Sequence, residues 1–473
     1  MRRAARGSPV IHDARVRPLT DRPARAGGFV LYWMQQSQRA AGNHALEYAV
    51  QRANARGLPL RVGFGLTDDY PEATLRAYRF MLEGLAETAA TLEARGIPFV
   101  LRRGAPPAVA LALARGAAEV VCDRGYLRHQ RQWREEVAAH APCPVVQVEA
   151  DAVVPVAVAS PKAEWAARTL RPRIAARRDE FLVPLAETPL RRRGGVAEAR
   201  GLDARDTERL ARGLRVDRTV PAVTHLHPGG SREARRRLAA FVRGPRRRYA
   251  DERADPEAGA VSRLSMYLHF GQISPLEVAL GAAGAATFLE ELIVRRELAI
   301  NFVTYTDGYD GWRALPAWAR GTLARHARDA RPAVYTRAEL ERAATHDPIF
   351  NAAMRDMRAC GYLHNHLRMY WGKKILEWSA DPEAGHATAL ALNNRYFLDG
   401  RDPSSYANVG WLFGLHDRPW PERPVFGTVR SMTAGGLARK IDLGAYQAAV
   451  DARVAAAAAI NAGRGRAPGR RRA

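Results

Sequence analysis

The sequence predicts an α/β + all-α protein, in which a doubly wound parallel α/β domain over residues 26–151 precedes an all-helical domain over residues 230–460. In the first part, short apolar and β-branched runs alternate with amphipathic stretches, which is typical of parallel strands joined by crossover helices. After Gly230, strand-like runs become rare and helical spacing continues nearly to the end. The 473 residues, 47% of them hydrophobic, suffice for two packed domains.

Five strands are expected in the α/β domain, with a helix between each pair. The strand candidates are residues 29–33, 60–66, 98–104, 119–125 and 145–151, and helices fit at 43–56, 73–95, 105–115 and 127–140. The first strand ends at Trp33 and runs into Met34 and Gln35, with no GxGxxG sequence after it. A dinucleotide-binding loop is therefore not expected there.

Three further segments complete the predicted organisation. Residues 152–229 are rich in proline and arginine and lack clean periodicity, so we interpret them as a connecting region on the surface. Residues 1–25 carry seven arginines and are predicted to be a disordered basic arm. Residues 461–473 are predicted to form a basic tail.

Composition limits the possible partners and compartments. The formal net charge of +24 predicts a polyanionic partner, although only four of the 73 basic residues are lysine, which also fits a general compositional bias. Cys122, Cys143 and Cys360 form no CxxC or Cys/His pattern, so neither a metal nor a disulfide framework is expected. No apolar run is long enough to cross a bilayer, and we expect a monomer in a reducing bacterial cytosol.

The stretch over residues 362–402, with the segment that follows it to residue 442, is the most informative part of the chain. It crowds large aromatic and polar residues together: Trp371, Trp378, Trp411 and Trp420 with Asn365, Arg368, Asn393 and Asp399. Such polar chemistry is unusual among large aromatics. The combination resembles a flavin pocket.

Several segments resemble the class II cyclobutane pyrimidine dimer photolyases of the photolyase/cryptochrome superfamily. They are LYWMQ, YADERADPEAGAVSRLSMYLHFGQIS, FLEELIVRRELAINF, LRMYWGKKILEW, LDGRDPSSYA and ERPVFG, and they follow the family's order across almost the whole chain. The resemblance implies a DNA-binding lyase that repairs UV-damaged DNA: excited FADH⁻ donates an electron to a flipped-out dimer. It also implies FAD in the helical domain and a possible second antenna chromophore, of unknown identity, in the α/β domain.

The motif SRLS precedes the apolar run MYLHF. By itself it is typical of a helix cap, although small hydroxyls at a helix start can also cradle a phosphate. The resemblance favours the cradle, because Tyr249 lies twelve residues ahead of Val261, the residue just before the motif. It implies that FAD is bound by Tyr249, Val261, Ser262, Arg263, Leu264 and Ser265.

Arg368 and Asp399 could each be a surface charge in so basic a chain. A reduced flavin anion needs a fixed cation, however, and a buried arginine needs a carboxylate partner. The resemblance implies that the two form a buried ion pair beside the isoalloxazine ring, with Asn393 near its N5 atom. The adjacent Asn394 is an alternative to Asn393 for this contact. Asn365 and Arg401 complete the expected FAD-binding residues.

A flipped dimer needs an aromatic wall and a polar group that stabilises its radical anion. The resemblance implies that Trp411 is the wall, Met369 a sulfur contact and Glu291 the carboxylate at the pyrimidine edge. Asn365 and Arg253 are expected to contact the dimer and the DNA backbone, and Asn393 joins Glu291, Met369 and Trp411 as a catalytic residue. From the pattern alone, Glu291 could instead pair with Arg295 at helical spacing.

Trp371 and Trp378 lie seven residues apart and share one helix face, which often means core packing. The resemblance implies that they belong to an electron relay between flavin and surface. Its middle member falls at Phe350, where relatives have tryptophan, so the relay is predicted to be interrupted. Two other functions stay open: a cryptochrome-like photoreceptor with little repair, and a nucleic-acid-binding protein without cofactor.

Overall fold

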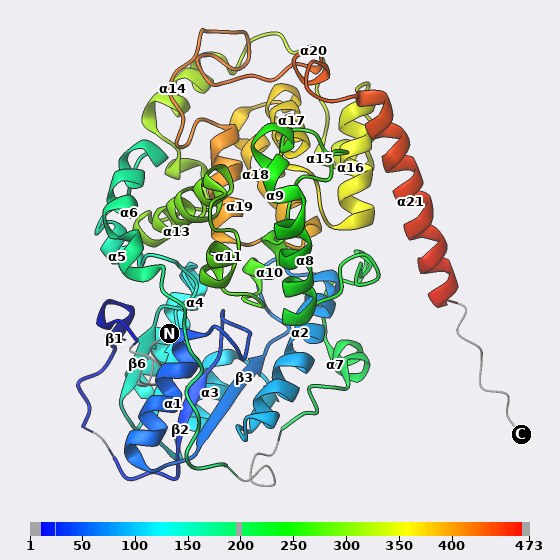
Figure 1. Cartoon of the computed structure of the whole chain (residues 1–473). Helices are drawn as coiled ribbons and strands as arrows, with labels where there is room; N and C mark the ends of the chain where they lie inside the picture. Colours follow the sequence, from blue (N-terminus) through cyan, green and yellow to red (C-terminus); the bar gives the residue numbers. More distant parts are fainter. Residues whose placement is uncertain (1–10, 24, 195–200, 466–473) are drawn as a thin grey trace, which may run out of the picture.

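The computed structural model describes residues 11–23, 25–194 and 201–465 and places a β-sheet at one end of the molecule and helices at the other (Figure 1). The six strands are β1 (Val16–Pro18), β2 (Phe29–Trp33), β3 (Leu60–Leu66), β4 (Phe99–Arg103), β5 (Ala117–Asp123) and β6 (Val145–Val148). Their order is β1-β6-β5-β2-β3-β4, and every neighbouring pair except β1 with β6 is parallel. The predicted parallel α/β fold is confirmed: the five predicted strands are present and parallel, and β1 is a sixth strand that was not predicted.

Helices cover both faces of this sheet because successive strand residues point to opposite sides. In β2, Val30 and Tyr32 pack into the cluster that includes α1 (His44–Arg56) and α2 (Leu75–Ala94). Their neighbours Leu31 and Trp33 pack into the cluster that includes α3 (Pro106–Ala114) and α4 (Arg128–His140). Burial on both faces explains why the strands are continuous apolar runs.

The predicted disordered arm is wrong for the part that the structure describes. After a short 3-10 helix (Asp13–Arg15), β1 pairs antiparallel with β6, so that Val16 lies opposite Val148. The Arg15 guanidinium is buried and donates to the carbonyls of Glu149, Ala152 and Val153 at 3.2, 2.9 and 2.6 Å. An arginine that looked like a solvated charge thus fastens the strand, while residues 1–10 lie outside the described residues.

The region between the two domains is more ordered than predicted. It contains α5 (Val156–Ala159), α6 (Ala167–Phe181) and α7 (Thr207–Gly213). In α6, Leu170, Ile174 and Phe181 are buried in one apolar cluster, so this segment belongs to the core instead of lying over the surface. Arginines on the exposed side of α6 masked that apolar spacing in the sequence.

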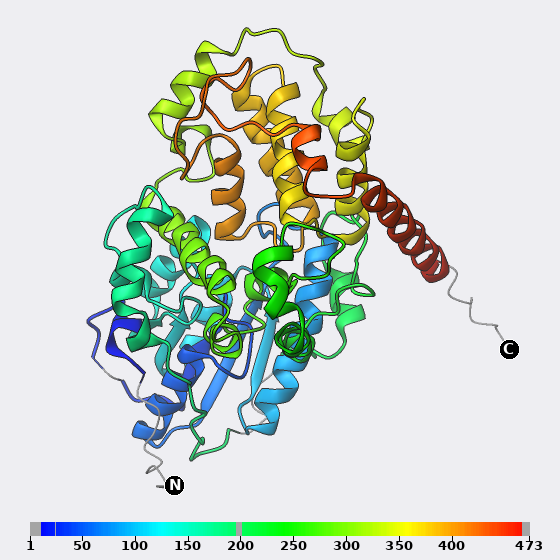
Figure 2. The same ribbon diagram turned by 45° about the horizontal axis from the view of Figure 1, so that its top comes forward.

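The helical half wraps around α17, α18 and α19, as the view in Figure 2 shows. Its helices are α8 (Ser231–Arg243), α9 (Pro245–Glu252), α10 (Ser265–His269), α11 (Pro275–Gly281), α12 (Ala286–Leu289), α13 (Arg296–Tyr305), α14 (Ala317–Arg325), α15 (Arg337–Arg342), α16 (Pro348–Cys360), α17 (Asn365–Trp378), α18 (Pro382–Tyr396), α19 (Pro403–Leu412), α20 (Ala434–Ala438) and α21 (Leu443–Gly465). A π-helical turn (Glu290–Arg295) joins α12 to α13, and Trp312–Ala314 form a 3-10 turn. Helix α21 extends into the predicted basic tail, whose residues 466–473 lie outside the described residues.

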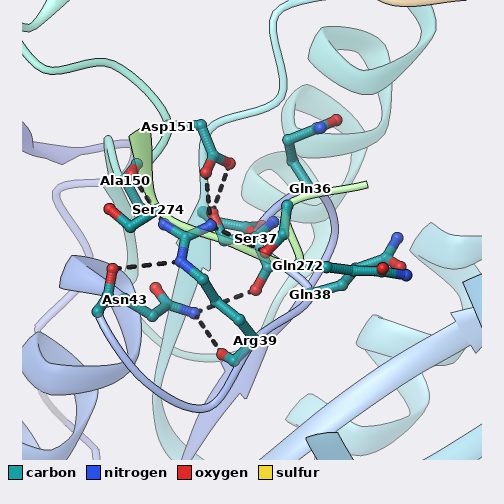
Figure 3. A network of polar contacts seen from close by, with 12 residues as sticks. Gln36, Ser37, Gln38, Arg39, Asn43, Ala150, Asp151, Gln272 and Ser274 are labelled. Atoms are coloured by element: carbon teal, nitrogen blue, oxygen red, sulfur yellow. Dashed lines mark hydrogen bonds and ion pairs between the residues drawn. The ribbon is translucent and has the colours of Figure 1, made fainter. Parts of the chain in front are cut away.

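A buried polar network connects the end of β2 to the helical half (Figure 3). Arg39 is paired with Asp151 at 2.6 Å and also donates to the carbonyls of Ala150 and Gly271 at 2.9 and 3.0 Å. Both side chains of the pair are almost fully buried, and each hydrogen bond reduces the cost of desolvating them. Because Gly271 follows α10, the network fixes the strand ends relative to the helices.

A second buried arginine, Arg76 of α2, makes a similar connection. Its guanidinium donates to the carbonyls of Met357 and Tyr396 at 3.1 and 2.8 Å, at the ends of α16 and α18. A cation is favourable there, since helix C-termini carry unsatisfied carbonyls and partial negative charge. None of the described helices is long and apolar enough to cross a membrane.

Candidate functional site

Helix α17 presents predicted site residues on one of its faces. The Nδ1 atom of His364 accepts the main-chain N–H of His366 at 3.3 Å and thereby caps the helix. Asn365, Arg368 and Met369 follow at positions i, i+3 and i+4, so they share a face. Asn365 is exposed and the other two are half-buried, so this face is available to a ligand.

The predicted ion pair between Arg368 and Asp399 is confirmed. Two hydrogen bonds of 3.1 and 3.4 Å join the side chains, which are only 16% and 12% exposed. The Arg368 guanidinium also stacks on Phe397, 3.9 Å from the ring centroid. These are therefore not surface charges, and the pair supplies a fixed cation whose own partner is already in place.

Asn393 and Asn394 are both buried at the end of α18, and their hydrogen bonds distinguish them. The Asn394 amide is engaged at both ends: it donates to Glu72 at 2.6 Å and accepts the main-chain N–H of Arg401 at 2.9 Å. Asn393 donates to the Asn394 oxygen at 3.1 Å. Asn394 is thus committed to structural hydrogen bonds, and the ligand contact of Asn393 stays a prediction.

The predicted phosphate loop lies between α9 and α10, and Ser265 is the first residue of α10. Ser262 is half-buried, Arg263 adopts a positive φ of 52°, and its guanidinium lies 5.5 Å from the ring centroid of Tyr362. Tyr249 lies on α9 and packs edge-on against Phe288, with centroids 5.3 Å apart. The loop thus faces the start of α17.

A cavity of about 580 Å³, including its mouth, adjoins this loop and is lined mostly by polar and charged residues. Burial lowers the pKa of His364 to about 4, so its ring is neutral at pH 7. The His364 Nε2 atom and the Tyr446 hydroxyl are buried there without a partner among the described residues. An unsatisfied buried polar atom is costly, so these two groups fit a polar ligand that would satisfy them. The lining residues are Leu226, His227, Pro256, Glu257, Arg263, Asp356, Cys360, Tyr362, His364, Tyr446 and Arg453.

Glu291 does not make the salt bridge with Arg295 that helical spacing allowed. The turn over Glu290–Arg295 is π-helical, which changes the spacing at which side chains meet. Arg295 lies 3.6 Å from Glu290, whereas Glu291 binds Arg253 at 2.6 Å. Glu291 and Arg253, both predicted to contact the substrate, are thus brought together, each with a side chain 38% exposed.

Trp411, the predicted stacking wall, lies on α19 beside two cations. The Lys373 ammonium is 5.1 Å and the Arg430 guanidinium 5.5 Å from its ring centroid. Lys373 is fully buried and donates to the carbonyl of Leu412 at 2.5 Å. Burial lowers the pKa of Lys373 to about 7, although Asp417 acts in the opposite direction. No pattern in the sequence indicated the buried position of this lysine, which looks like an ordinary helix residue.

The aromatic residues of the predicted relay lie in the core formed by α16 and α17. Trp371 is fully buried, donates to the Met354 sulfur at 3.1 Å and packs against Phe397, with ring centroids 6.2 Å apart. Phe397 is the ring beneath Arg368, which places Trp371 close to the predicted flavin face. Phe350 packs edge-on against Trp378 at 5.3 Å.

The structure contains a second cavity at the carboxyl ends of β2 and β3, in the α/β domain for which the resemblance implied a possible antenna chromophore but no site residues. Ligands bind at such ends in open α/β sheets, where the strand order reverses, as it does around β2. We call it the sheet-edge cavity; it encloses about 710 Å³ including its mouth. Its lining is mainly apolar and aromatic: Met34, Gln35, Gln36, Gln38, Phe64, Gly65, Thr67, Tyr70, Ala73, Ala77, Tyr78, Met81, Pro106, Gln130, Trp133, His269, Phe270 and Arg401.

The sheet-edge cavity also contains unsatisfied polar atoms. The amide nitrogen of Gln35, the amide oxygen of Gln38, the Tyr78 hydroxyl and the Nη2 atom of Arg401 are all buried without a partner among the described residues. Arg401 was predicted to bind FAD beside Arg368, but its buried side chain lines this other cavity and donates to the Asn394 carbonyl. The run of polar residues after β2 was the sequence feature that could have indicated this cavity, but such a run is also typical of an ordinary loop.

Comparisons with known proteins agree on one family. A profile of the family described as DNA photolyase matches residues 30–190. The chain is similar to a deoxyribodipyrimidine photo-lyase of Methanothermobacter thermautotrophicus, with 45% identity over 92% of this chain and 98% of that protein. A deoxyribodipyrimidine photo-lyase of Oryza sativa subsp. japonica is 40% identical over 92% of this chain and 89% of its own length. A solved class III photolyase from Agrobacterium tumefaciens has a similar fold, with a TM-score of 0.67 at 19% identity over 86% of this chain and 84% of that one.

Proposed function

This chain belongs to the DNA photolyase family, and on that premise we propose that it repairs cyclobutane pyrimidine dimers in UV-damaged DNA by a light-driven electron transfer. The single observation that carries the proposal is the set of predicted residues gathered along α17: the Arg368–Asp399 pair, Met369 and, through Lys373, the Trp411 wall. Together they offer a fixed charge and an aromatic surface on one face of the helical half.

The chemistry of this region fits FAD. Arg368 would hold a negative charge on the reduced ring, because Asp399 fixes its orientation and Phe397 supports its face. Asn393 would bond to the ring edge, and the loop from Val261 to Ser265 with Tyr249 would hold the diphosphate and ribityl parts. When bound in its reduced form, FAD supplies an electron on absorbing light.

The opposite side of the site would hold the dimer. Trp411 stacks against the flipped bases, and Met369 contacts them through its sulfur. Glu291 accepts a hydrogen bond from the pyrimidine imide edge and stays paired with Arg253, which it orients toward a phosphate. Asn365 is exposed at the start of α17 and so reaches both the dimer and the cofactor.

DNA is the expected macromolecular partner of this strongly basic chain. Phosphate contacts release condensed counterions, so affinity for a dimer-containing duplex should fall steeply as salt rises. We expect a monomer to bind one lesion, which sedimentation with and without such a duplex tests. A dimer that forms only on DNA would contradict this expectation.

The sheet-edge cavity fits a second, light-harvesting chromophore. Its aromatic walls suit a planar ring, and the four unpaired groups of Gln35, Gln38, Tyr78 and Arg401 suit the polar edge of such a ring. Gln35→Leu together with Tyr78→Phe should remove any co-purified second chromophore while FAD is retained. Loss of FAD with retention of the other chromophore would reverse the assignment of the two sites.

A light-versus-dark assay tests the proposed function. Purified protein with chemically reduced FAD is mixed with an oligonucleotide that contains one thymine dimer, and illuminated samples are compared with dark ones. Intact thymines should be restored in light alone. A protein that binds FAD and dimer DNA but restores no thymines would instead be the cryptochrome-like photoreceptor, and repair in the dark would exclude both.

A further inference from the structure

A tyrosine and a histidine form a hydrogen-bonded pair at the far end of the α17 aromatic residues, where Trp378 ends the helix. The Tyr335 hydroxyl lies 2.7 Å from Nδ1 of His346, and the two rings stack with centroids 5.9 Å apart. Both rings contact Trp378, at centroid distances of 5.6 Å for Tyr335 and 5.0 Å for His346. Trp378 is buried, Tyr335 is half-buried and His346 is exposed, so the three lead from the core to solvent.

The hydrogen bonds of this pair favour one direction for the shared proton. The Tyr335 oxygen already accepts the main-chain N–H of His346 at 2.9 Å, so its own hydrogen is free to be donated to Nδ1. A structural role alone does not need this bond, because the Tyr335 main-chain N–H donates to the Trp378 carbonyl at 3.0 Å and already fastens the loop.

Trp378 itself lacks a comparable exit for a proton. Its Nε1 atom is buried without a hydrogen-bond partner among the described residues. A Trp378 radical cation would therefore keep its positive charge, and that charge would lie 5.3 Å from the Lys374 ammonium. The nearby cation makes a positive charge on the indole less favourable, although Glu377 at 2.6 Å from Lys374 offsets part of this effect.

We propose that Tyr335 and His346 form the terminal, proton-coupled donor that supplies the electron for light-driven reduction of the cofactor. The proposal rests on the proposed function, since bound oxidised FAD takes an electron from the tryptophans under light. One electron passes from Tyr335 to the Trp378 radical cation, while the phenolic proton passes to Nδ1 of His346. The products are neutral Trp378, a neutral Tyr335 radical and a protonated His346 at the surface, and an external reductant then restores the tyrosine.

This pair compensates for Phe350. Phenylalanine is much harder to oxidise than tryptophan, so a positive charge on Trp371 reaches Trp378 only by a longer step past the Phe350 ring. Such a slow step supports reduction of the cofactor only if the positive charge does not travel back from Trp378 to Trp371. Transfer of the proton to His346 makes the return unfavourable, because electron and proton must then move back together.

The test detects the amino-acid radical itself. Oxidised, FAD-loaded protein is illuminated and frozen, and electron paramagnetic resonance identifies the radical. The decay rate of the radical is measured in parallel in H₂O and in D₂O. The unmodified protein should show a neutral tyrosyl radical whose decay is slowed in D₂O. Tyr335→Phe keeps the ring that packs on Trp378 and should abolish the tyrosyl signal and the isotope effect; Tyr305→Phe on α13 is the matched control and should change neither.

Two further variants separate the parts of the proposal. His346→Gln should shorten the lifetime of the tyrosyl radical severalfold, because glutamine is too weak a base to hold the proton. Phe350→Trp should raise the radical yield without changing its identity. A tyrosyl signal that survives in Tyr335→Phe, or no tyrosyl signal in the unmodified protein, would overturn the proposal. Repair by chemically reduced protein should be equal in all variants, and its failure in the unmodified protein would count against the proposed function alone.

Discussion

The two ligand regions of this molecule differ in how their polar groups are satisfied. Along α17 the charges already have partners, as in the Arg368–Asp399 and Arg253–Glu291 pairs. At the sheet-edge cavity, Gln35 and Tyr78 are among the groups buried without partners. A region with fixed, paired charges can stabilise charge that develops during a reaction, whereas a region with unpaired groups gains most by binding a ligand that completes them. The difference supports the proposal that the chemistry takes place along α17 and that the sheet-edge cavity holds a light-harvesting chromophore.

The largest expected effect comes from breaking the ion pair along α17. Asp399→Ala leaves the Arg368 cation poorly exposed and unpaired, which should cost about 3–5 kcal/mol in the free energy of unfolding and abolish FAD binding. Chemical denaturation and flavin absorbance measure the two effects. Asp451→Ala is the control, because its pair with Arg355 is exposed and should contribute no more than about 1 kcal/mol. Full FAD occupancy in Asp399→Ala would contradict the placement of the cofactor.

The next effect concerns the aromatic wall. Trp411→Ala should weaken binding of dimer-containing DNA by about 1–3 kcal/mol, the contribution of one base–aromatic stack, and leave binding of undamaged DNA nearly unchanged. Trp165→Ala is the control, since Trp165 is a 53% exposed tryptophan just before α6 that is not predicted to contact the dimer. Equal losses on damaged and undamaged DNA would mean that Trp411 supports the fold and does not bind the dimer.

Two adjacent glutamates allow a closely matched test of the substrate side. Glu291→Gln should reduce the number of dimers repaired per absorbed photon with FAD still bound, because a neutral amide stabilises the pyrimidine edge less well and no longer orients Arg253. Glu290→Gln changes the same π-helical turn but affects Arg171 and Arg295 instead. Equal repair yields for the two variants would mean that Glu291 does not contact the substrate and has only a structural role.

A further expected effect is a change in stability with pH that originates at Lys373. Burial holds its native pKa at about 7, below the ordinary value of 10.5, so between these values the unfolded chain binds more protons than the folded one. Stability contributed through this group should therefore rise as pH increases from 7 to 10.5. Arg430 also lowers this pKa, whereas Asp417 raises it.

Denaturation at pH 7 and pH 9 checks this, with Lys373→Met as the test and Lys374→Met as the control. The free energy of unfolding should no longer rise between pH 7 and pH 9 in the Lys373 variant, whereas it should still rise in the Lys374 variant. An unchanged pH dependence in Lys373→Met would show that its ammonium is not desolvated beside Trp411.

Much of the fold was predictable, because buried parallel strands and amphipathic helices repeat with different periods. β2 and β3 have the predicted limits for that reason. β1 was missed because three residues are too few for a period and because the adjacent Arg15 looked solvated. The apolar face of α6 was likewise hidden among arginines, whose positions relative to the core depend on the whole fold.

The site was predictable only where family resemblance supplied long-range information. Spacing alone could not bring Arg368 to Asp399, 31 residues away, or Arg253 to Glu291, 38 residues away. A local rule gave the wrong partner for Glu291, because the sequence does not reveal a π-helical turn. The sheet-edge cavity was missed since Gln35 becomes an unpaired buried group only after the helical half has covered the strand ends.

The number of dimers repaired per photon absorbed by FAD tests the division of roles most directly. It is measured at a wavelength that FAD absorbs, in the unmodified protein, in the Gln35→Leu/Tyr78→Phe variant and in Glu291→Gln. We predict that the sheet-edge variant equals the unmodified protein and that Glu291→Gln falls well below both. A sheet-edge variant that loses this yield while Glu291→Gln keeps it would contradict the assignment of the chemistry to α17.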